Sequence, residues 1–480
     1  MKTSRILTSL LVSALSWGLT APASGLDDPT GVISSENVEL LGTIPNPGVI
    51  GARFRGDVMY VTSLTGLTTY DISEPAAPQL LGALPLPHFE NEDVDLGGNI
   101  LLISNDAAES TGILYVIDIS NPAAPSLLST FQMGGNPLLG GPGHTASCVL
   151  ACSFAWVTDG GGIRVIDLRN PAAPVTVGTF ATPAGGGLIT HDVQVDGDGI
   201  AWVVGFGGTA GYRLPAGYDG NGLGEMVAKT NSAGNSRYLD TLGLDDGSTY
   251  NDFVHHNSHR RAGDDVVFVT EEDYTRPGCR GAGSFETWSL PVDDLGNPTG
   301  ADMTPLDKWE TELLADTAQP AAVCSAHYFD IRSNVVAQGW YEQGMRLLDV
   351  SDPADIRQIG YYITPASAMW ASYWAPTDAK GRILYALDAS HGIDVLEFDR
   401  PTTGALAEPS RCTEEQGKST PGSGKGKGKK NGHGKTRTVC PGEERPEPVE
   451  APILPGWVGS TGVAAGAPSP TLGYACRIRL

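Results

Sequence analysis

The stretch Gly162-Ile-Arg-Val-Ile-Asp-Leu-Arg-Asn-Pro-Ala-Ala-Pro174 decides the fold of this 480-residue chain, because it recurs. Close copies cover residues 66–78, 112–125 and 344–355, and a degenerate copy covers 392–401. The alternation of apolar residues in each copy predicts a β-strand. The Asp or Asn before Pro predicts a turn, because its side chain can accept backbone N–H bonds while Pro fixes φ. Each copy is therefore predicted to be a strand followed by a tight turn.

The first three copies begin about 48 residues apart, a period that is typical of propellers and solenoids. Another apolar segment precedes each copy, as at 154–158, and a shorter one follows, as at 175–178. Four strands per repeat make one propeller blade. We expect seven blades, with inner strands that begin near residues 49, 88, 144, 191, 255, 327 and 370. The predicted fold is an all-β, seven-bladed propeller of four-stranded antiparallel blades over residues 38–400.

The phrase GIRVIDLRNPAAPVTVG resembles the LVIVD repeat, a propeller-forming repeat of bacteria and archaea. The resemblance extends over roughly residues 38–400 and implies a propeller, but it implies no single activity. The segment 38–44 is similar to the outer strands predicted at 79–82 and 175–178. We therefore expect this N-terminal strand to supply the outer strand of blade seven and so to close the ring.

The two ends of the chain differ in composition from the repeats. Lys2 and Arg5 precede a mostly apolar run over 6–19, and Ala21-Pro22-Ala23 is a small-residue cleavage pattern. These features predict a secretory signal peptide at residues 1–25, and hence an extracellular or periplasmic protein. No later segment is long and apolar enough to span a bilayer. Residues 402–480 are rich in Gly, Lys and Pro, and we expect them to be a disordered tail.

The charge of the chain bears on its partners. The net charge is −24, so binding of nucleic acid through the general surface is not expected. The lysines of the tail leave two interpretations open, namely contact with an anionic cell envelope or a solvated linker. We expect a monomer that meets an extracellular ligand or protein whose identity the sequence does not specify.

Seven cysteines in an exported protein predict disulfide bonds. Cys148 and Cys152 bracket a tight turn between two apolar runs, although a CxxxC pair could also bind a metal. Two further bonds are hypotheses. Cys279 and Cys324 lie in two predicted loops and could pair. Cys412, Cys440 and Cys476 lie in the tail, where one of the three would be left over.

Histidine recurs at the same point of the predicted repeat, at the start of the inner strand. Five of the seven blades carry one there: His88, His144, His191, His255 or His256, and His327. Because inner strands surround the propeller axis and begin on one face, these side chains should converge at one mouth of the central channel. Imidazole groups favour a transition metal such as Cu or Zn, and carboxylates alone would favour Ca. The alternative is a structural role, in which each His bonds a neighbouring blade.

Other candidate ligand-binding residues lie in loops that are predicted to reach the same face. They are Glu271, Glu272, Asp273, Trp340, Tyr341, Glu342, Trp370 and His391. The carboxylates could complete a metal site, and the aromatic rings could stack on a sugar or another small ligand, or simply pack between blades. Alternation along a strand places His255 and His256 on opposite faces, but it does not say which face meets the channel.

Two functions follow from these features. The first is a secreted binding or interaction scaffold, with a divalent metal at the histidine-rich mouth. The second is a metal-dependent enzyme, an oxidoreductase or hydrolase, that uses the same histidines. The sequence contains no GxSxG, Walker or HExxH motif that would indicate a particular reaction.

Overall fold

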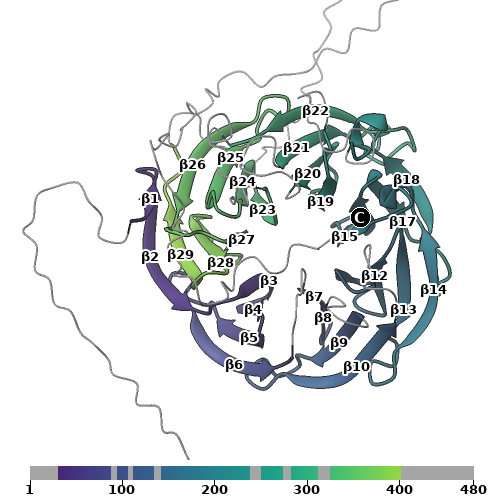
Figure 1. Ribbon diagram of the computed structural model, residues 1–480, viewed down its shortest axis with the longest axis horizontal. Helices are drawn as coiled ribbons and strands as arrows, with labels where there is room; N and C mark the ends of the chain where they lie inside the picture. The colour runs from purple at the N-terminus through teal and green to yellow at the C-terminus, as the bar shows by residue number, and fades with distance from the viewer. Residues whose placement is uncertain are drawn as a thin grey trace, which may run out of the picture.

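The computed structural model describes residues 31–87, 94–105, 112–134, 142–237, 250–273, 283–311 and 325–401. These residues form seven antiparallel sheets arranged as a ring around a central axis (Figure 1). The predicted seven-bladed β-propeller is therefore confirmed. The described helical residues are confined to two short 3-10 turns, η1 (Pro183–Gly185) and η2 (Ser232–Gly234). No helix in the described part of the chain is long and apolar enough to cross a membrane.

Blades one to four follow the order of the chain, and the first strand of each lies nearest the axis (Figure 1). Blade one consists of β3 (Val49–Arg55), β4 (Val58–Ser63), β5 (Gly66–Asp71) and β6 (Gln79–Pro85). Blade two consists of β7 (Val94–Gly97), β8 (Ile100–Asn105), β9 (Gly112–Asp118) and β10 (Ser126–Gly134). Blade three consists of β11 (Ala146–Val149), β12 (Phe154–Asp159), β13 (Gly162–Asp167) and β14 (Val175–Ala181). Blade four consists of β15 (Thr190–Val195), β16 (Ile200–Gly205), β17 (Gly208–Arg213) and β18 (Glu225–Lys229).

Blades five to seven complete the ring. Blade five consists of β19 (Val254–His259), β20 (Val266–Glu272), β21 (Ser284–Ser289) and β22 (Thr304–Trp309). Blade six contains β23 (Phe329–Arg332), β24 (Val335–Gly339), β25 (Met345–Asp349) and β26 (Arg357–Ile363). Blade seven contains β27 (Met369–Trp374), β28 (Ile383–Asp388) and β29 (Gly392–Phe398).

The N-terminal segment closes the ring as the sequence predicts. Strand β2 (Val38–Pro45) pairs antiparallel with β29, with Val38 opposite Phe398. It is the fourth strand of blade seven, so no half-built blade is left. A second strand, β1 (Ile33–Ser34), pairs with β26 as a fifth strand of blade six. The sequence did not predict β1, because two residues are too short to show a periodicity.

The recurring Asp of the repeat shapes the turn that follows the third strand in blades one to three. The carboxylates of Asp71, Asp118 and Asp167 each accept the backbone N–H two residues later, at 2.8, 2.8 and 2.9 Å. In the second copy the amide oxygen of Asn121 accepts the N–H of Ala123 at 3.2 Å. The bond of Asn121 is the one predicted for the residue before proline, whereas the bonds of the three aspartates, four residues before proline, were not predicted. The N–H of Ser73 also holds the pKa of the Asp71 carboxyl below its ordinary value.

The same turns join neighbouring blades. Thr69 in blade one donates to the carbonyl of Pro122 in blade two at 2.6 Å. Ser129 in blade two likewise donates to the carbonyl of Pro171 in blade three at 2.7 Å. Each proline turn therefore serves its own blade and the blade before it, which explains why the motif recurs as a unit.

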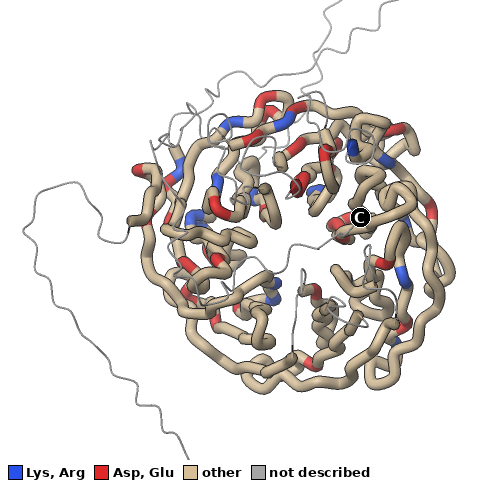
Figure 2. Tube along the Cα trace, in the orientation of Figure 1, with Lys and Arg blue, Asp and Glu red and all other residues tan. Residues whose placement is uncertain are grey.

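A second set of contacts joins the inner strands, where acidic positions occur in several blades (Figure 2). Asp95 of β7 accepts the backbone N–H of Cys148 in β11 at 2.7 Å. Asp330 of β23 accepts the backbone N–H of Trp374 in β27 at 3.0 Å. Apolar clusters fill the space between blades, and most combine side chains of two neighbours. The propeller is thus held together blade by blade rather than by one central core.

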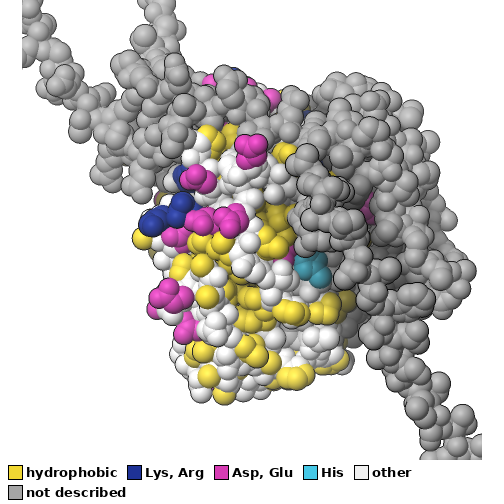
Figure 3. Space-filling view, turned by 90° about the vertical axis from the view of Figure 1, so that its left-hand side faces the viewer, with side chains coloured by type: hydrophobic (Ala, Val, Ile, Leu, Met, Phe, Trp, Pro, Cys, Tyr) yellow, Lys and Arg dark blue, Asp and Glu magenta, His cyan; other side chains and the backbone are white. Residues whose placement is uncertain are grey.

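Hydrophobic side chains also reach the outer surface. Figure 3 views the ring from the side of β1 and β2, where apolar groups are interspersed with acidic and uncharged ones. Leu40 and Leu41 of β2 are each 39% exposed, and Leu80 of β6 is 67% exposed. These residues lie on outer strands, which have a neighbouring strand on one side only.

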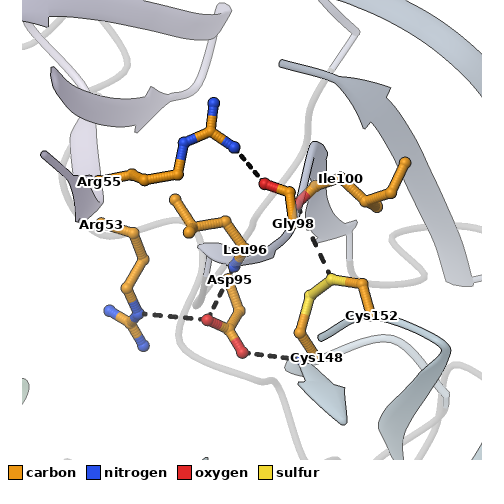
Figure 4. The surroundings of a disulfide bond; sticks show 8 residues. All are labelled: Arg53, Arg55, Asp95, Leu96, Gly98, Ile100, Cys148 and Cys152. Atoms are coloured by element: carbon orange, nitrogen blue, oxygen red, sulfur yellow. Dashed lines mark hydrogen bonds and ion pairs between the residues drawn. A yellow bond between two sulfur atoms is a disulfide. The ribbon is translucent and has the colours of Figure 1, made fainter. Parts of the chain in front are cut away.

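The predicted bond between Cys148 and Cys152 is present at the tip of the β11–β12 hairpin (Figure 4). Leu150, Ala151 and Cys152 all have positive φ, at 51°, 52° and 62°. The hairpin tip packs against blade two so closely that a Cβ on Gly97 would lie 2.6 Å from the backbone of Ala151. Several predicted features lie outside the described residues, namely the signal peptide at 1–25, the tail at 402–480, Cys279, Cys324, Cys412 and Cys440.

Candidate metal centre

Four of the predicted histidines meet near the propeller axis, at the end where the inner strands begin. They come from four consecutive blades: His144 before β11, His191 in β15, His256 in β19, and His327 before β23. His191 is 6% exposed, and His256 and His327 are fully buried. The convergence expected from the repeat therefore occurs for these four side chains. His88 lies outside the described residues.

Irregular strand pairing directs some of these side chains. The pairing of β15 with β16 skips His191, since Thr190 faces Gly205 and Asp192 faces Val204. In the same way the pairing of β19 with β20 skips His256, and that of β27 with β28 skips Trp370. An extra residue in one strand turns its side chain out of the regular alternation. The bulges thus explain why strict alternation did not identify which of His255 and His256 meets the axis.

The four imidazole rings form a continuous row. His144 Nε2 lies 2.9 Å from His191 Nε2. The ring centroids of His191 and His256 are 4.2 Å apart, and those of His256 and His327 are 4.0 Å apart. Two rings are oriented by backbone carbonyls: His191 Nδ1 lies 3.2 Å from the carbonyl oxygen of His256, and His327 Nδ1 lies 2.8 Å from that of Trp370.

Glu272, the last residue of β20, places its carboxylate among these rings. Its Oε2 lies 3.6 Å from His191 Nε2 and 4.0 Å from His256 Nε2. Its Oε1 lies 4.0 Å from His327 Nε2. The potential ligand atoms of His191, His256 and Glu272 all lie within 4.8 Å of one another. Two imidazoles and one carboxylate at this separation could hold a metal ion.

The burial of the site determines its protonation. Desolvation holds the pKa values of His191 and His256 far below the ordinary histidine value. Burial also lowers the pKa of His327, to about 4. The pKa of Glu272 is raised by burial, against the opposing effects of His327 and of the Tyr341 hydroxyl. His191, His256 and His327 are therefore neutral at neutral pH, which is the form that binds metals.

Aromatic residues from blades six and seven complete one side of the cluster. The Tyr341 hydroxyl donates to Glu272 Oε1 at 2.6 Å. The rings of Tyr341 and Trp370 each lie 4.8 Å from the His327 ring, and 5.3 Å from one another. Both were predicted as ligand-binding residues, and both contact the histidine cluster itself.

The structure places His255 and Glu271 in a separate buried polar cluster between blades four and five. His255 Nε2 lies 3.3 Å from Glu286 Oε2, and its Nδ1 lies 3.0 Å from the Thr209 hydroxyl. Glu271 Oε1 accepts the backbone N–H groups of residues 252 and 253. Glu286 in turn accepts the indole N–H of Trp288 at 2.7 Å.

Four other predicted ligand-binding residues have contacts outside the group of four histidines: Asp273, Trp340, Glu342 and His391. Asp273 is buried and its backbone N–H donates to Ser325. Trp340 packs edge-on against Trp309, with ring centroids 5.3 Å apart. Glu342 lies half-buried in the turn between β24 and β25. His391 lies in blade seven, where its Nε2 is 2.9 Å from Asp394 Oδ2.

Sequence reasoning missed three residues of the surroundings. The buried carboxylate of Asp192 accepts a hydrogen bond from the Asn257 side chain of the next blade. The Tyr328 ring lies 4.8 Å from both His256 and His327. Two of them could have been proposed from the sequence, because Asp192 directly follows His191 and Tyr328 directly follows His327.

The blades and the cluster together define a β-propeller with buried histidines and a carboxylate near its axis. The family model of the LVIVD repeat matches residues 54–84, 101–132 and 142–182, which are blades one to three. The chain thus contains LVIVD repeats in blades one to three, and its seven-bladed fold is consistent with the LVIVD-repeat β-propeller family. No curated protein matches the chain in sequence.

Solved structures resemble the chain in fold. The Cps50 (Swd1) β-propeller domain of Myceliophteria thermophila is 13% identical, with a TM-score of 0.51, over 75% of this chain and 100% of that one. The RRP9 WD40 repeats are 10% identical, with a TM-score of 0.50, over 77% of this chain and 99% of that one. At such identities the likeness concerns the fold alone.

Proposed function

We propose that this protein is an exported LVIVD-repeat propeller that binds a divalent transition metal between His191, His256 and Glu272, and that acts as a binding scaffold. The observation that carries the proposal is the distance of at most 4.8 Å between the three potential ligand atoms. These ligands come from β15, β19 and β20, so the metal would link blades four and five.

The donor set selects the class of metal. Imidazole is a preferred ligand of Zn and Cu, whereas Ca²⁺ takes oxygen ligands. Two histidines and one carboxylate therefore favour Zn or Cu over Ca. His144 Nε2, at 2.9 Å from His191 Nε2, and His327 Nε2, at 4.0 Å from Glu272 Oε1, are within reach as further donors.

Export is supported by two independent features. Residues 1–25 have the composition of a secretory signal peptide. The Cys148–Cys152 bond fits an oxidising compartment, because disulfides are rare where thiols are kept reduced. We therefore place the protein outside the cell or in the periplasm. Its partner would be an extracellular ligand or protein, and the lysine-rich tail would contact the anionic envelope.

A metal-dependent enzyme, an oxidoreductase or hydrolase, is the second candidate. It is favoured by the number of clustered donors, because catalytic zinc sites use three protein ligands and keep a fourth position for water. Hydrolysis of a generic aryl ester that requires the bound metal would favour this candidate over a purely binding role.

The test is the metal content of the purified full-length protein after loading with Zn²⁺ or Cu²⁺ and removal of excess ion. We expect one equivalent in the wild type and a loss of at least tenfold in affinity in His191→Ala and Glu272→Gln. His391→Gln is the matched control, since His391 lies in blade seven beside Asp394. Wild-type protein without stoichiometric metal, or equal binding by all variants, would overturn the proposal.

A further inference from the structure

We propose that Tyr341 is a positioning residue of the metal centre, whose hydroxyl holds one oxygen of Glu272 so that the other faces His191 and His256. The inference rests on the proposed function and deepens it, because it identifies what sets the orientation of the carboxylate ligand. Tyr341 would not bind the metal itself.

The two oxygens of Glu272 have different neighbours. Oε1 accepts the Tyr341 hydroxyl at 2.6 Å, a short hydrogen bond of the kind that a carboxylate forms. Oε2 lies nearest to His191 Nε2 and His256 Nε2, at 3.6 and 4.0 Å. A carboxylate held at one oxygen cannot rotate freely about its last bond. The hydrogen bond therefore leaves Oε2 as the oxygen available to a metal between the two imidazoles.

The backbone of Tyr341 is held in an unfavourable conformation. Its φ is +25°, a value that a residue with a side chain rarely adopts. Its carbonyl oxygen accepts hydrogen bonds from the backbone of Gly344 at 3.2 Å and of Met369 at 3.0 Å, and from the Ser367 hydroxyl at 3.0 Å. Backbone strain that surrounding structure maintains is concentrated at functional sites. Here the hydrogen bonds from Ser367 and Met369 hold the turn in which the Tyr341 side chain reaches Glu272.

The hydroxyl and the ring of Tyr341 make separate contacts, so their roles can be tested separately. The ring packs against His327 and Trp370, at 4.8 and 5.3 Å between centroids. A phenylalanine would keep these packing contacts. Only the hydroxyl reaches Glu272. If Tyr341 had a purely structural role, removing its hydroxyl would leave the metal affinity unchanged.

Hydrogen-bond partners of metal ligands typically change metal affinity by 10- to 100-fold when they are removed. We therefore expect Tyr341→Phe to bind Zn²⁺ about 10- to 100-fold more weakly than the wild type in competition with a chelator. The visible absorption of the Co²⁺-loaded variant should also change, because it reports the geometry of the ligands. Tyr362→Phe is the matched control: it removes another buried hydroxyl that donates to a carboxylate, that of Asp394 at 3.0 Å in blade seven, outside the metal centre. It should bind within about twofold of the wild type.

The outcomes separate the two proposals. A wild-type protein that takes up no metal overturns the proposed function and this inference with it. A metal-loaded wild type matched by Tyr341→Phe in affinity and in Co²⁺ spectrum overturns this inference alone. The thermal midpoint of each apoprotein is measured in parallel. A Tyr341→Phe variant with a lower midpoint but unchanged affinity would show a structural role and would equally overturn the inference.

Discussion

Replacing Cys148 and Cys152 together by Ser should destabilise the propeller by an amount that follows from the size of the closed loop. The bond joins residues four apart in sequence, so the closed loop contains five residues. Loop-closure entropy for such a loop corresponds to about 2 kcal/mol at 25 °C. The short loop keeps this value below the contribution of a bond that closes a long loop.

Two further features of the hairpin tip bear on the size of the effect. Leu150 and Ala151 have left-handed φ values of 51° and 52°, which cost non-glycine residues about 1–2 kcal/mol each. Without the disulfide the tip could relax, which would reduce the loss. Asp95 opposes relaxation, because its carboxylate accepts the backbone N–H of Cys148 at 2.7 Å. We therefore expect a loss of about 2 kcal/mol in the free energy of unfolding.

The assay is equilibrium unfolding in urea, followed by the fluorescence of buried tryptophans such as Trp156. The double variant is compared with the wild type, each with and without reductant, because other cysteines of the chain could also respond. We expect the variant to unfold at a lower urea concentration than the wild type. We also expect reductant to lower the urea midpoint of the variant less than that of the wild type. Equal midpoints for the two oxidised proteins, or an equal shift on reduction, would refute the reasoning.

Three further predictions concern other parts of the ring. Asp394 raises the pKa of His391, so this histidine stabilises the fold fully below about pH 6.5 and progressively less as pH rises through the folded pKa. The thermal midpoint of His391→Gln should therefore lie furthest below that of the wild type in acid, and the two midpoints should coincide in alkali. A difference in midpoint that does not change with pH would contradict this. Gly112→Ala would place a Cβ against the carbonyl oxygen of residue 142 and should cost about 1–3 kcal/mol, whereas Gly42→Ala meets no atom within 4 Å and should be neutral in urea unfolding. His255→Gln should lower the thermal midpoint by breaking the buried contact with Glu286, yet leave metal stoichiometry unchanged; loss of metal would instead make His255 part of the centre.

The architecture could be predicted from the sequence because its determinants are local and repeated. The apolar alternation of 162–174 and the polar residue before its proline recur, and the four close copies form the same strand and turn. Ring closure by β2 was also predictable, since its sequence is similar to that of other outer strands. The repeat placed His144, His191 and His327 at equivalent points, and equivalent points of blades meet at one end of the axis.

The membership of the candidate site was decided by tertiary structure. His255 and His256 are neighbours in sequence, and only the bulge in β19 determines that His256 joins the cluster. Glu271 and Glu272 are likewise adjacent, but they lie in different polar clusters because successive residues of a strand point to opposite sides.

The contact between Tyr341 and Glu272 joins residues 69 apart in sequence, through a turn that blade seven holds at positive φ. Patterns of period two report which segments are strands. Bulges and contacts between blades depend on how complete blades pack, so they leave no local signal. The sequence by itself therefore determined the propeller and the end of its axis where histidines gather, and the packing of five blades decided which side chains meet there.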